Sequence, residues 1–290
     1  MLLREYLIRL HLCKGVGIAT ERKILNYIKM NHAVPSSVGL SQLLKIERAE
    51  AIQLNKRIVS NETTEKMNMS LKISDCLTIV DENYPQKLKE IYNPPLVLFY
   101  RGDITLLDSP LLGVVGARQN SVYANQVLEK IIPEIVDANI VTISGLAQGI
   151  DSICHRITLN NGGKTIGVIG TGINMNYPKI NEQLQNEMMR NHLVITEYAA
   201  FEKPLSFHFP QRNRIIAGLC DSLLVVEAKE KSGSLITANI ALEENRNVLV
   251  VPGRVDAELS RGCNLLFREG AKPVLDSSDI LEEFAHDLTK

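Results

Sequence analysis

Four segments rich in glycine, serine and threonine each follow a short apolar run that is typical of a buried β-strand. Glycine lets backbone N–H groups approach a bound oxyanion, and the helix N-termini that follow such loops add donors and a positive dipole. Because the carboxyl ends of parallel strands meet at one edge of a sheet, the segments predict an anion-binding rim. The predicted ligands in them are Gly116, Arg118, Ser144, Gly145, Gly149, Gly170, Gly172, Ser232, Gly233 and Ser234.

Any one of these loops can be explained without a ligand, since glycine and serine also make tight turns between a strand and a helix. Turn chemistry alone does not require Arg118 beside Gly116, or two lysines (Lys229 and Lys231) just before Ser232. The four loops together therefore favour a bound anion.

A polar, basic and aromatic stretch runs from Phe207 to Arg214, directly before an apolar helical run. Arg212, Asn213 and Arg214 at a helix start suit the clamping of a phosphate, and Phe207 or Phe209 offers a face on which a base can stack. The alternative is an amphipathic helix start with solvated arginines and core phenylalanines.

Two nucleotide-binding motifs fail in detail. Gly163-Lys164-Thr165 resembles the end of a P-loop, but Thr158 replaces the first glycine and the run precedes a strand. The turn that begins at Gly170 follows a strand, but Met175 occupies the third-glycine position of the dinucleotide fingerprint. We therefore expect no ATPase activity and no nicotinamide cofactor.

Signals for catalysis are weak. Asp151 and His155 resemble an acid/base pair, but this spacing also gives an ordinary i,i+4 contact on a helix. Glu197 and Glu227, at strand ends, are the best carboxylates for an enzyme. We expect no catalytic residue and no metal site, since no His, Cys and Asp spacing closes one.

The elements that must position these residues alternate between strands and helices. Apolar strand-like runs occupy 111–116, 140–144, 165–170, 193–196, 223–228 and 247–252, and crossover helices are predicted over 123–136, 180–190 and 234–244. This order predicts an α/β fold, a Rossmann-like, doubly wound and mostly parallel sheet. The runs at 76–80 and 96–100 are predicted to add edge strands.

A small all-helical domain is predicted at residues 1–70, with an extended Rossmann-like domain at 71–290. Helical spacing from Leu2 to Met30 is broken once, at Gly15-Val16-Gly17, which indicates a helix-hairpin. A second helix is predicted from Ser41 to Val59, and the polar run at 60–70 is interpreted as a linker. Residues 1–70 are basic, with 11 Lys and Arg against 6 Asp and Glu.

The composition is that of an ordinary globular protein. The chain has 290 residues, a net charge of −1 and 45% hydrophobic residues. Its five cysteines form no C-x-x-C pair, which argues against disulfides and indicates a reducing cytoplasm. Cys154 and Cys220 lie in apolar runs and are predicted to pack in the core. No apolar run is long enough to span a membrane, so we expect neither a membrane segment nor export.

Seven motifs in order give the chain a family resemblance. They are GVVGAR (113–118), SGLAQGID (144–151), GTGINMNYP (170–178), FPQRNRIIAGL (209–219), SGSLITA (232–238), VPG (251–253) and GCNLLFREGA (262–271). Over residues 75–275 the chain resembles the DprA/Smf family, the bacterial DNA-processing proteins of natural transformation. The resemblance implies a non-enzymatic, cytoplasmic homodimer that binds single-stranded DNA, protects incoming strands and loads the RecA recombinase. The N-terminal helices resemble that family's sterile-alpha-motif-like or helix-hairpin-helix extension.

Position by position, the resemblance implies a DNA pocket of Arg118, the SGLAQGID loop, the Gly170–Gly172 turn and residues 212–214. Lys179 joins this set mainly through the resemblance. A dimer interface is predicted from apolar residues near a sheet edge, which are Leu259, Leu265, Leu266 and Phe267. The chain ends soon after the last predicted strand, so we expect no C-terminal winged helix.

Two other functions remain open at this point. A nucleoside-monophosphate N-ribosidase on a related scaffold would use Glu197 or Glu227, but Pro252-Gly253-Arg254-Val255 does not continue that group's P-G-G-x-G-T turn. A regulatory nucleotide sensor is the third possibility. The resemblance favours the DNA binder.

Overall fold

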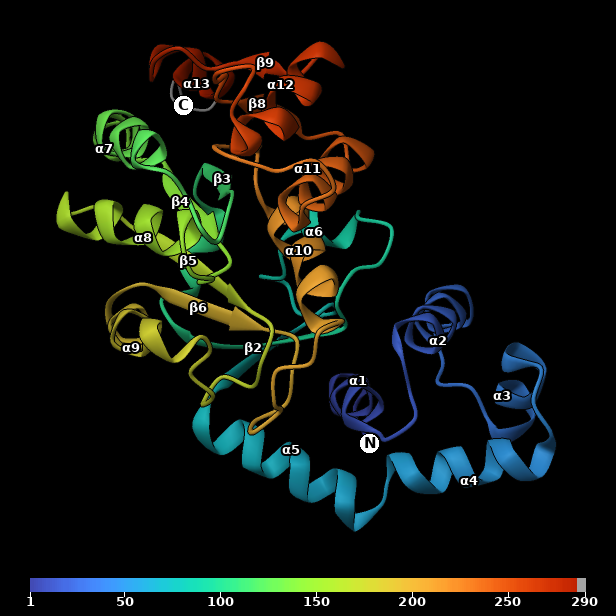
Figure 1. Cartoon of the computed structure of the whole chain (residues 1–290). Coiled ribbons are helices and arrows are strands. Elements are labelled where there is room, and N and C mark those ends of the chain that lie inside the picture. The colour runs from blue at the N-terminus through green and yellow to red at the C-terminus, as the bar shows by residue number, and fades with distance from the viewer. Residues whose placement is uncertain (286–290) are drawn as a thin grey trace.

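The structure, a computed structural model, describes residues 1–285. Within them one sheet of nine strands has the order β1-β2-β6-β5-β4-β3-β7-β8-β9 (Figure 1). The strands are β1 (Asp75–Thr78), β2 (Val97–Gly102), β3 (Leu111–Val115), β4 (Val141–Ser144), β5 (Thr165–Ile169), β6 (Leu193–Thr196), β7 (Ser222–Val225), β8 (Asn247–Val250) and β9 (Lys272–Pro273).

The sheet is parallel from β6 to β9, and β1 and β2 extend it as antiparallel strands. Strand β3 pairs with β4 on one side and with β7 on the other. The chain adds strands β4 to β6 on one side of β3 and strands β7 to β9 on its other side, so the strand order reverses at the boundary between β3 and β7. In open α/β sheets, ligands bind outside the carboxyl ends of the strands at such a switch point. The predicted Rossmann-like sheet with added edge strands is confirmed; the two-residue strand β9 was not predicted.

Helices cover both faces of the sheet, because every residue of the inner strands such as β3 is buried and has to be shielded on both sides. Helices α7 and α8 pack on one face together with apolar residues of β3 and β7, and α10 and α11 pack on the other (Figure 1). These helices are α6 (Gln86–Lys89), α7 (Val122–Asp137), α8 (Ile150–Asn160), α9 (Glu182–Asn191), α10 (His208–Leu219), α11 (Gly233–Glu243), α12 (Arg261–Arg268) and α13 (Ser278–Leu281).

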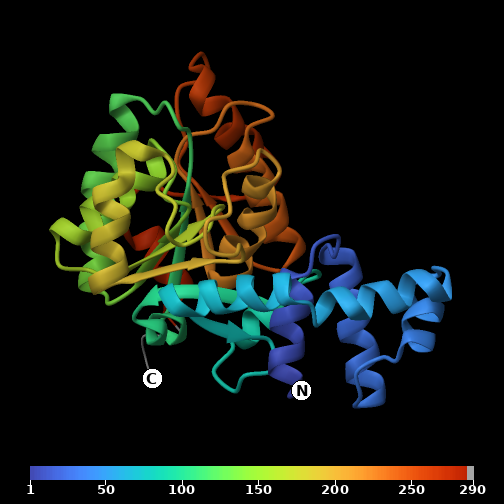
Figure 2. The same cartoon turned by 90° about the horizontal axis from the view of Figure 1, so that it is seen from below.

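The N-terminal region is helical, as predicted, and its first two helices flank the Gly15–Gly17 turn. Its helices are α1 (Leu3–Leu12), α2 (Ile18–Asn31), α3 (Ser37–Leu44), α4 (Arg48–Ile58) and α5 (Asn61–Ile73). In Figure 2, α5 lies along the edge of the sheet beside β1, and α2 to α4 project beyond it.

Two details of the helical prediction are wrong. The single helix expected from Ser41 to Val59 is divided at Lys45, whose φ of 57° ends α3. The expected linker is helix α5, which begins because the Ser60 side chain accepts a hydrogen bond from the Thr63 N–H. The division into two domains at residue 70 stays a prediction, and α5 crosses that position.

Helix α1 and the sheet share one hydrophobic cluster, in which Leu7 and Leu10 are buried together with Leu77 and Phe99. Among residues 1–285, no helix is long and apolar enough to cross a bilayer.

Candidate functional site

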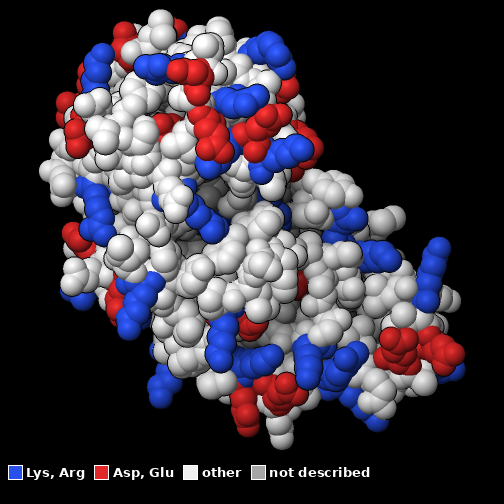
Figure 3. All heavy atoms as spheres, in the orientation of Figure 1, with Lys and Arg blue, Asp and Glu red and all other residues white. Residues whose placement is uncertain are grey.

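A cavity of about 1080 Å³ opens at the switch point between β3 and β7. Its walls come from the loops after β3, β4 and β7, from the first turns of α10 and α11, and from Tyr177, Pro204, Ser206 and Leu259. Figure 3 shows a hollow on this face with Lys or Arg atoms at its edge. Three of the four segments predicted to form an anion-binding rim, those after β3, β4 and β7, therefore meet around one opening.

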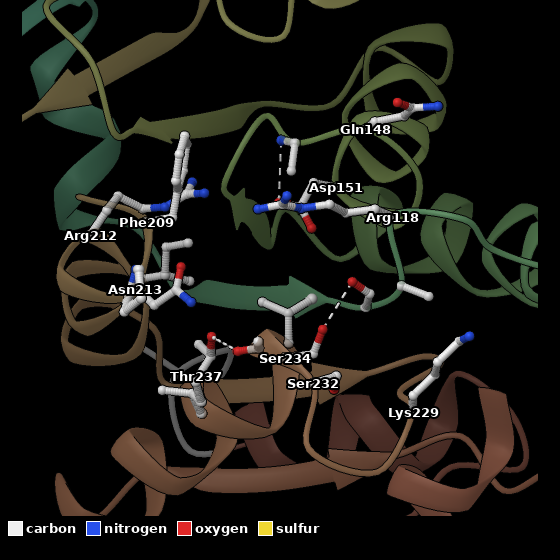
Figure 4. A pocket seen from close by; sticks show the side chains of 18 of the residues that line it. Arg118, Gln148, Asp151, Phe209, Arg212, Asn213, Lys229, Ser232, Ser234 and Thr237 are labelled. Atoms are coloured by element: carbon white, nitrogen blue, oxygen red, sulfur yellow. Dashed lines mark hydrogen bonds between the residues drawn. The ribbon is translucent and has the colours of Figure 1, made fainter. Parts of the chain in front are cut away.

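Arg118 and Phe209 make the entrance of this pocket. Arg118 is exposed, and its guanidinium carbon lies 5.6 Å from the centre of the Phe209 ring. Tyr177 packs beside Phe209, with ring centres 5.4 Å apart. Figure 4 shows Arg118 extending across the pocket toward Phe209 and Arg212. A cation beside an aromatic face suits a ligand with a phosphate and a base.

Arg212 forms the floor of the pocket and is only 4% exposed. Its Nη1 donates to the carbonyl oxygen of Val168, and its Nε has no hydrogen-bond partner among the described residues. Burial, together with the charge of Arg118, lowers the pKa of Arg212 to about 10, although Asp151 opposes the shift. Two cations around one opening are electrostatically costly without an anion, so the site favours a negatively charged ligand.

The first residue of the loop after β4, Gly145, has no room for a side chain because Arg212 packs against it. A Cβ atom at Gly145 would lie 2.0 Å from Nη1 of Arg212. The buried Asp151 carboxylate accepts hydrogen bonds from the backbone N–H groups of Gly145 (3.1 Å) and Ala147 (3.4 Å). Burial raises the pKa of Asp151, against the effect of Arg212. Asp151 thus braces the loop and offsets part of the positive charge on the floor.

The N-terminus of α11 forms another part of the pocket wall. Ser232 is the N-cap residue, but its side chain caps no N–H of the helix, and its buried Oγ has no partner among the described residues. Ser234 Oγ donates to the Gly116 carbonyl oxygen at 2.9 Å and ties this wall to the loop after β3. The first N–H groups of α11 therefore remain for an anion.

Half of the predicted ligands line this cavity and half do not. Those that line it are Gly116, Arg118, Arg212, Asn213, Ser232, Gly233 and Ser234. Those that lie outside its lining are Ser144, Gly145, Gly149, Gly170, Gly172, Lys179 and Arg214.

The protein's own chain covers most of the residues in the second set. Ser144 Oγ donates to the Val114 carbonyl oxygen, and a Cβ at Gly172 would lie 2.3 Å from the Ala199 carbonyl oxygen. Gly149, with a φ of 84°, lies against the carbonyl oxygen of Ala117. For these residues, tight turns and close packing explain the sequence, which was the alternative considered for single loops.

Gly170 and Lys179 lie outside the pocket for different reasons. The Gly170 carbonyl oxygen accepts a hydrogen bond from His208 Nδ1 at 3.1 Å, and a Cβ there would lie 3.2 Å from the Phe209 ring. Gly170 therefore supports the aromatic wall from behind. Lys179 is exposed in a short 3-10 helix at 179–181 and does not line the cavity.

The prediction that Arg214 helps to clamp a phosphate is wrong, because its guanidinium is paired with a carboxylate away from the pocket. It is 8% exposed, and its Nη2 lies 2.6 Å from Oε1 of Glu197 in a buried ion pair. Two residues apart on a helix means about 200° of rotation, so Arg212 and Arg214 face opposite sides of α10. Arg214 is not available to a phosphate in this pocket.

The carboxylates considered for catalysis also have structural partners. Glu227 accepts hydrogen bonds from the backbone N–H and the hydroxyl of Ser121, at the N-terminus of α7, and Glu197 is paired with Arg214. Neither lines the cavity. His155 bonds to Thr165 Oγ1 at 2.6 Å, so the Asp151 and His155 pair does not form.

The two core cysteines are buried as predicted, and burial raises the pKa of both Cys154 and Cys220 to about 12. In the part of the chain that the structure describes, no group of three or more His, Cys, Asp or Glu side chains could hold a metal ion.

Among the lining residues that sequence reasoning did not single out are Tyr177 and Thr237. Thr237 had a usable signal, because it lies one helical turn after Gly233, and its Oγ1 donates to the Gly233 carbonyl oxygen. Tyr177 comes from a separate loop, and nothing in its spacing indicates that it reaches Phe209.

The apolar residues predicted for a dimer interface have different surroundings. Leu266 is 4% exposed and belongs to the core, so it is not available to a partner chain. Leu259 lines the pocket, Leu265 is half-buried, and Phe267 is 48% exposed. Phe267 is therefore the member of this set that best fits an interface.

A family model described as DNA recombination-mediator protein A matches residues 75–285. The chain belongs to this family. The DNA processing protein DprA of Streptococcus pneumoniae (strain ATCC BAA-255 / R6) is 50% identical over 207 residues, which are 71% of this chain and 73% of the relative. DprA of Bacillus subtilis (strain 168) is 44% identical over 208 residues, 71% of this chain and 70% of the relative. The resemblance inferred from the seven motifs is thus confirmed.

Solved structures of the family have the same fold. The X-ray structure of DprA from Streptococcus pneumoniae superimposes with a TM-score of 0.89 at 39% identity and covers 98% of this chain and 99% of that one. DprA from Helicobacter pylori, described for its single-stranded DNA binding mode, matches with a TM-score of 0.67 at 28% identity over 74% of this chain and 96% of that one. The first match includes the N-terminal helices, so the whole architecture is that of a known family member.

Proposed function

We propose that this protein binds single-stranded DNA, without chemical turnover, in the pocket between β3 and β7. The observation that carries the proposal is Arg118 beside the Phe209 ring at the entrance, above the buried Arg212. A phosphate can bind between the arginines and the N-terminus of α11, and a base can stack on the aromatic wall. The Helicobacter pylori relative, named for its single-stranded DNA binding mode, supports this assignment.

The geometry of the pocket favours a single strand over a duplex. Its walls come from several converging loops and the first turns of two helices, and its floor residue Arg212 is buried. A flexible strand can turn its phosphates and bases into such an opening, whereas a stiff duplex presents a convex surface. Because the contacts go to phosphates and to ring faces, binding should tolerate any sequence.

We further propose that the protein acts in the cytoplasm as a homodimer that protects incoming single strands and transfers them to RecA during natural transformation. The family and its DNA-processing relatives support this role. For the dimer, the exposed apolar residues Phe267, Leu275 and Val255 of the C-terminal part offer a surface, at 48%, 75% and 90% exposure.

The small-molecule enzyme is the weaker candidate. Its two carboxylates, Glu197 and Glu227, are held by Arg214 and Ser121 and do not reach the cavity. A titration with labelled oligo(dT), a duplex of equal length and AMP, run in parallel, separates the functions. We expect oligo(dT) to bind most tightly, the duplex more weakly, and AMP to release no adenine. Adenine release, or tighter binding of AMP than of oligo(dT), would refute the proposal.

The role with RecA needs its own measurement. The protein should shield oligo(dT) from a single-strand nuclease and shorten the lag of RecA assembly on strands coated with a single-strand binding protein. Unchanged nuclease digestion and an unchanged lag at saturating protein would contradict it.

A further inference from the structure

His11 belongs to α1 in the N-terminal region, but it contacts the loop between β6 and α10. Its Nε2 lies 2.6 Å from the carbonyl oxygen of Glu197, and its Nδ1 lies 3.0 Å from Oε1 of Glu21 in α2. In Figure 1 this loop extends from the sheet toward α1 and α5. A single side chain, 11% exposed, thus joins α1 and α2 to the segment that leads to the pocket.

Both partners of His11 are hydrogen-bond acceptors. A carbonyl oxygen and a carboxylate oxygen can both be satisfied only when each ring nitrogen carries a hydrogen, which requires the imidazolium. Burial by itself would lower the pKa of His11, but the charges of Glu21 and Glu197 and the two hydrogen bonds raise it to about 9. The contact is therefore formed by a charged histidine near neutral pH.

The same loop is held by the N-terminal region at a second point. The N–H of Ala200 donates to Oγ of Ser70 in α5 at 3.1 Å. At the first of these two points, the carboxylate of Glu197 also pairs with Arg214 of α10. After Ala200 the loop continues to Pro204 and Ser206, which line the cavity directly before α10 begins.

We propose that His11 is a positioning residue for the DNA pocket: the N-terminal helices fix the loop at 197–207, and this loop fixes the aromatic wall that carries Phe209. The proposal rests on the function proposed above. It assigns the N-terminal region a part in shaping the site, although it contributes no residue to the lining of the pocket.

Other charged groups surround His11 and have to be considered in any pH experiment. A cavity of about 310 Å³ beside it is lined by Lys14 and Cys13 of the turn after α1, Lys66 of α5, Glu21 of α2, and Glu197 and Glu202 of the loop. Lysine and arginine ordinarily keep their charge to about pH 10, and carboxylates are ionised above about pH 5. Burial raises the pKa of the Cys13 thiol. Burial also raises the pKa of Tyr198, which lines the same cavity, so His11 is the group expected to change charge between about pH 7 and pH 9.5.

The test compares oligo(dC) binding by the full chain, because cytosine does not titrate in this range. Wild-type affinity should fall about tenfold as the pH rises through the pKa of His11, to the level that His11→Ala shows throughout. Glu21→Gln is the conservative rescue, because its amide N–H can donate to a neutral Nδ1; its affinity should stay near the wild-type value and be independent of pH. His32→Asn is the matched control, since His32 is an exposed histidine of the same region.

Hydrogen exchange gives a readout that does not depend on DNA. The amides at 198–207, with Ala200 foremost, should exchange faster in His11→Ala and Ser70→Ala, while those of β3 to β5 keep their wild-type rates. If His11→Ala does not fold, the pH dependence of oligo(dC) affinity still tests the proposal: the affinity should fall with rising pH in the wild type and stay constant in Glu21→Gln. Wild-type exchange and affinity in His11→Ala, or a Glu21→Gln profile that follows the wild type, would overturn the proposal. If wild-type protein binds no single strand, the proposed function fails, and the exchange rates alone decide whether His11 positions the loop.

Discussion

Replacing Arg118 with alanine separates a ligand-binding role from a structural one. The side chain is exposed, and its described contact is the Phe209 ring at 5.6 Å. An exposed cation–π contact contributes about 0.5–1 kcal/mol. Part of this lost stability is offset, because removing Arg118 also removes its charge repulsion with Arg212, which lowers the pKa of Arg212. The free energy of unfolding should therefore change by about 0.5 kcal/mol at most.

Binding should change far more than stability. A charge-assisted hydrogen bond to a phosphate contributes about 1.5–3 kcal/mol, so Arg118→Ala should weaken oligo(dT) binding about ten- to a hundredfold. The slope of log K against log salt should become less steep by about 0.7, the value for one phosphate on a single strand. Fluorescence anisotropy at several salt concentrations measures the affinity and the slope, and a urea titration measures stability.

Arg156→Ala is the matched control. Arg156 is an exposed arginine on α8 and lies outside the lining of the pocket. It should keep the wild-type affinity and lose little of the salt slope. Equal losses in the two variants would mean that only general surface charge matters. Unchanged oligo(dT) binding in Arg118→Ala would refute the reasoning. The glycine- and serine-rich loops would then be explained by tight turns alone.

Three further predictions test other parts of the structure. Gly145→Ala puts a Cβ 2.0 Å from Arg212 Nη1, so it should cost about 1–3 kcal/mol of stability and weaken oligo(dT) binding, as thermal melts and anisotropy will show. Phe267→Asp should give monomers in light scattering with little change in the melting temperature, whereas Leu266→Ala, at a core position, should cost about 2–5 kcal/mol; a dimer that survives Phe267→Asp would contradict the proposed interface. Burial lowers the pKa of His155 to about 3. The unfolded chain therefore takes up a proton below about pH 6.5 that the folded chain does not. Stability contributed by a neutral His155 is lost as the pH falls, so between about pH 7 and pH 5 urea titrations should show the wild type losing about 2 kcal/mol more than His155→Gln.

The fold could be predicted well because its signals are local. Runs such as 111–116 and 165–170 are apolar at every position, as buried parallel strands have to be, and amphipathic segments lie between them. The two errors in the N-terminal region are also local. A polar composition at 61–73 hid a helix whose start is set by the Ser60 cap, and Lys45 interrupts a helical pattern by its backbone conformation.

The site could be predicted only in part. The sequence indicated that small residues and cations follow the strands, and parallel topology requires those strand ends to share one edge. It did not indicate which loops are open. Gly145 is covered by Arg212, and Gly172 by the chain near Ala199, in each case from a segment far along the sequence.

Helix geometry requires that Arg212 and Arg214 face opposite sides of α10, but the docking of α10 decides which of them reaches the pocket. The same holds for Leu266 and Phe267, adjacent residues of α12 of which one is buried and one exposed. Residue types and their spacing thus determined the strands, the crossovers and the edge of the sheet at which the pocket opens. Packing between distant segments decided which side chains line the pocket, because burial and contact depend on neighbours that the local sequence does not contain.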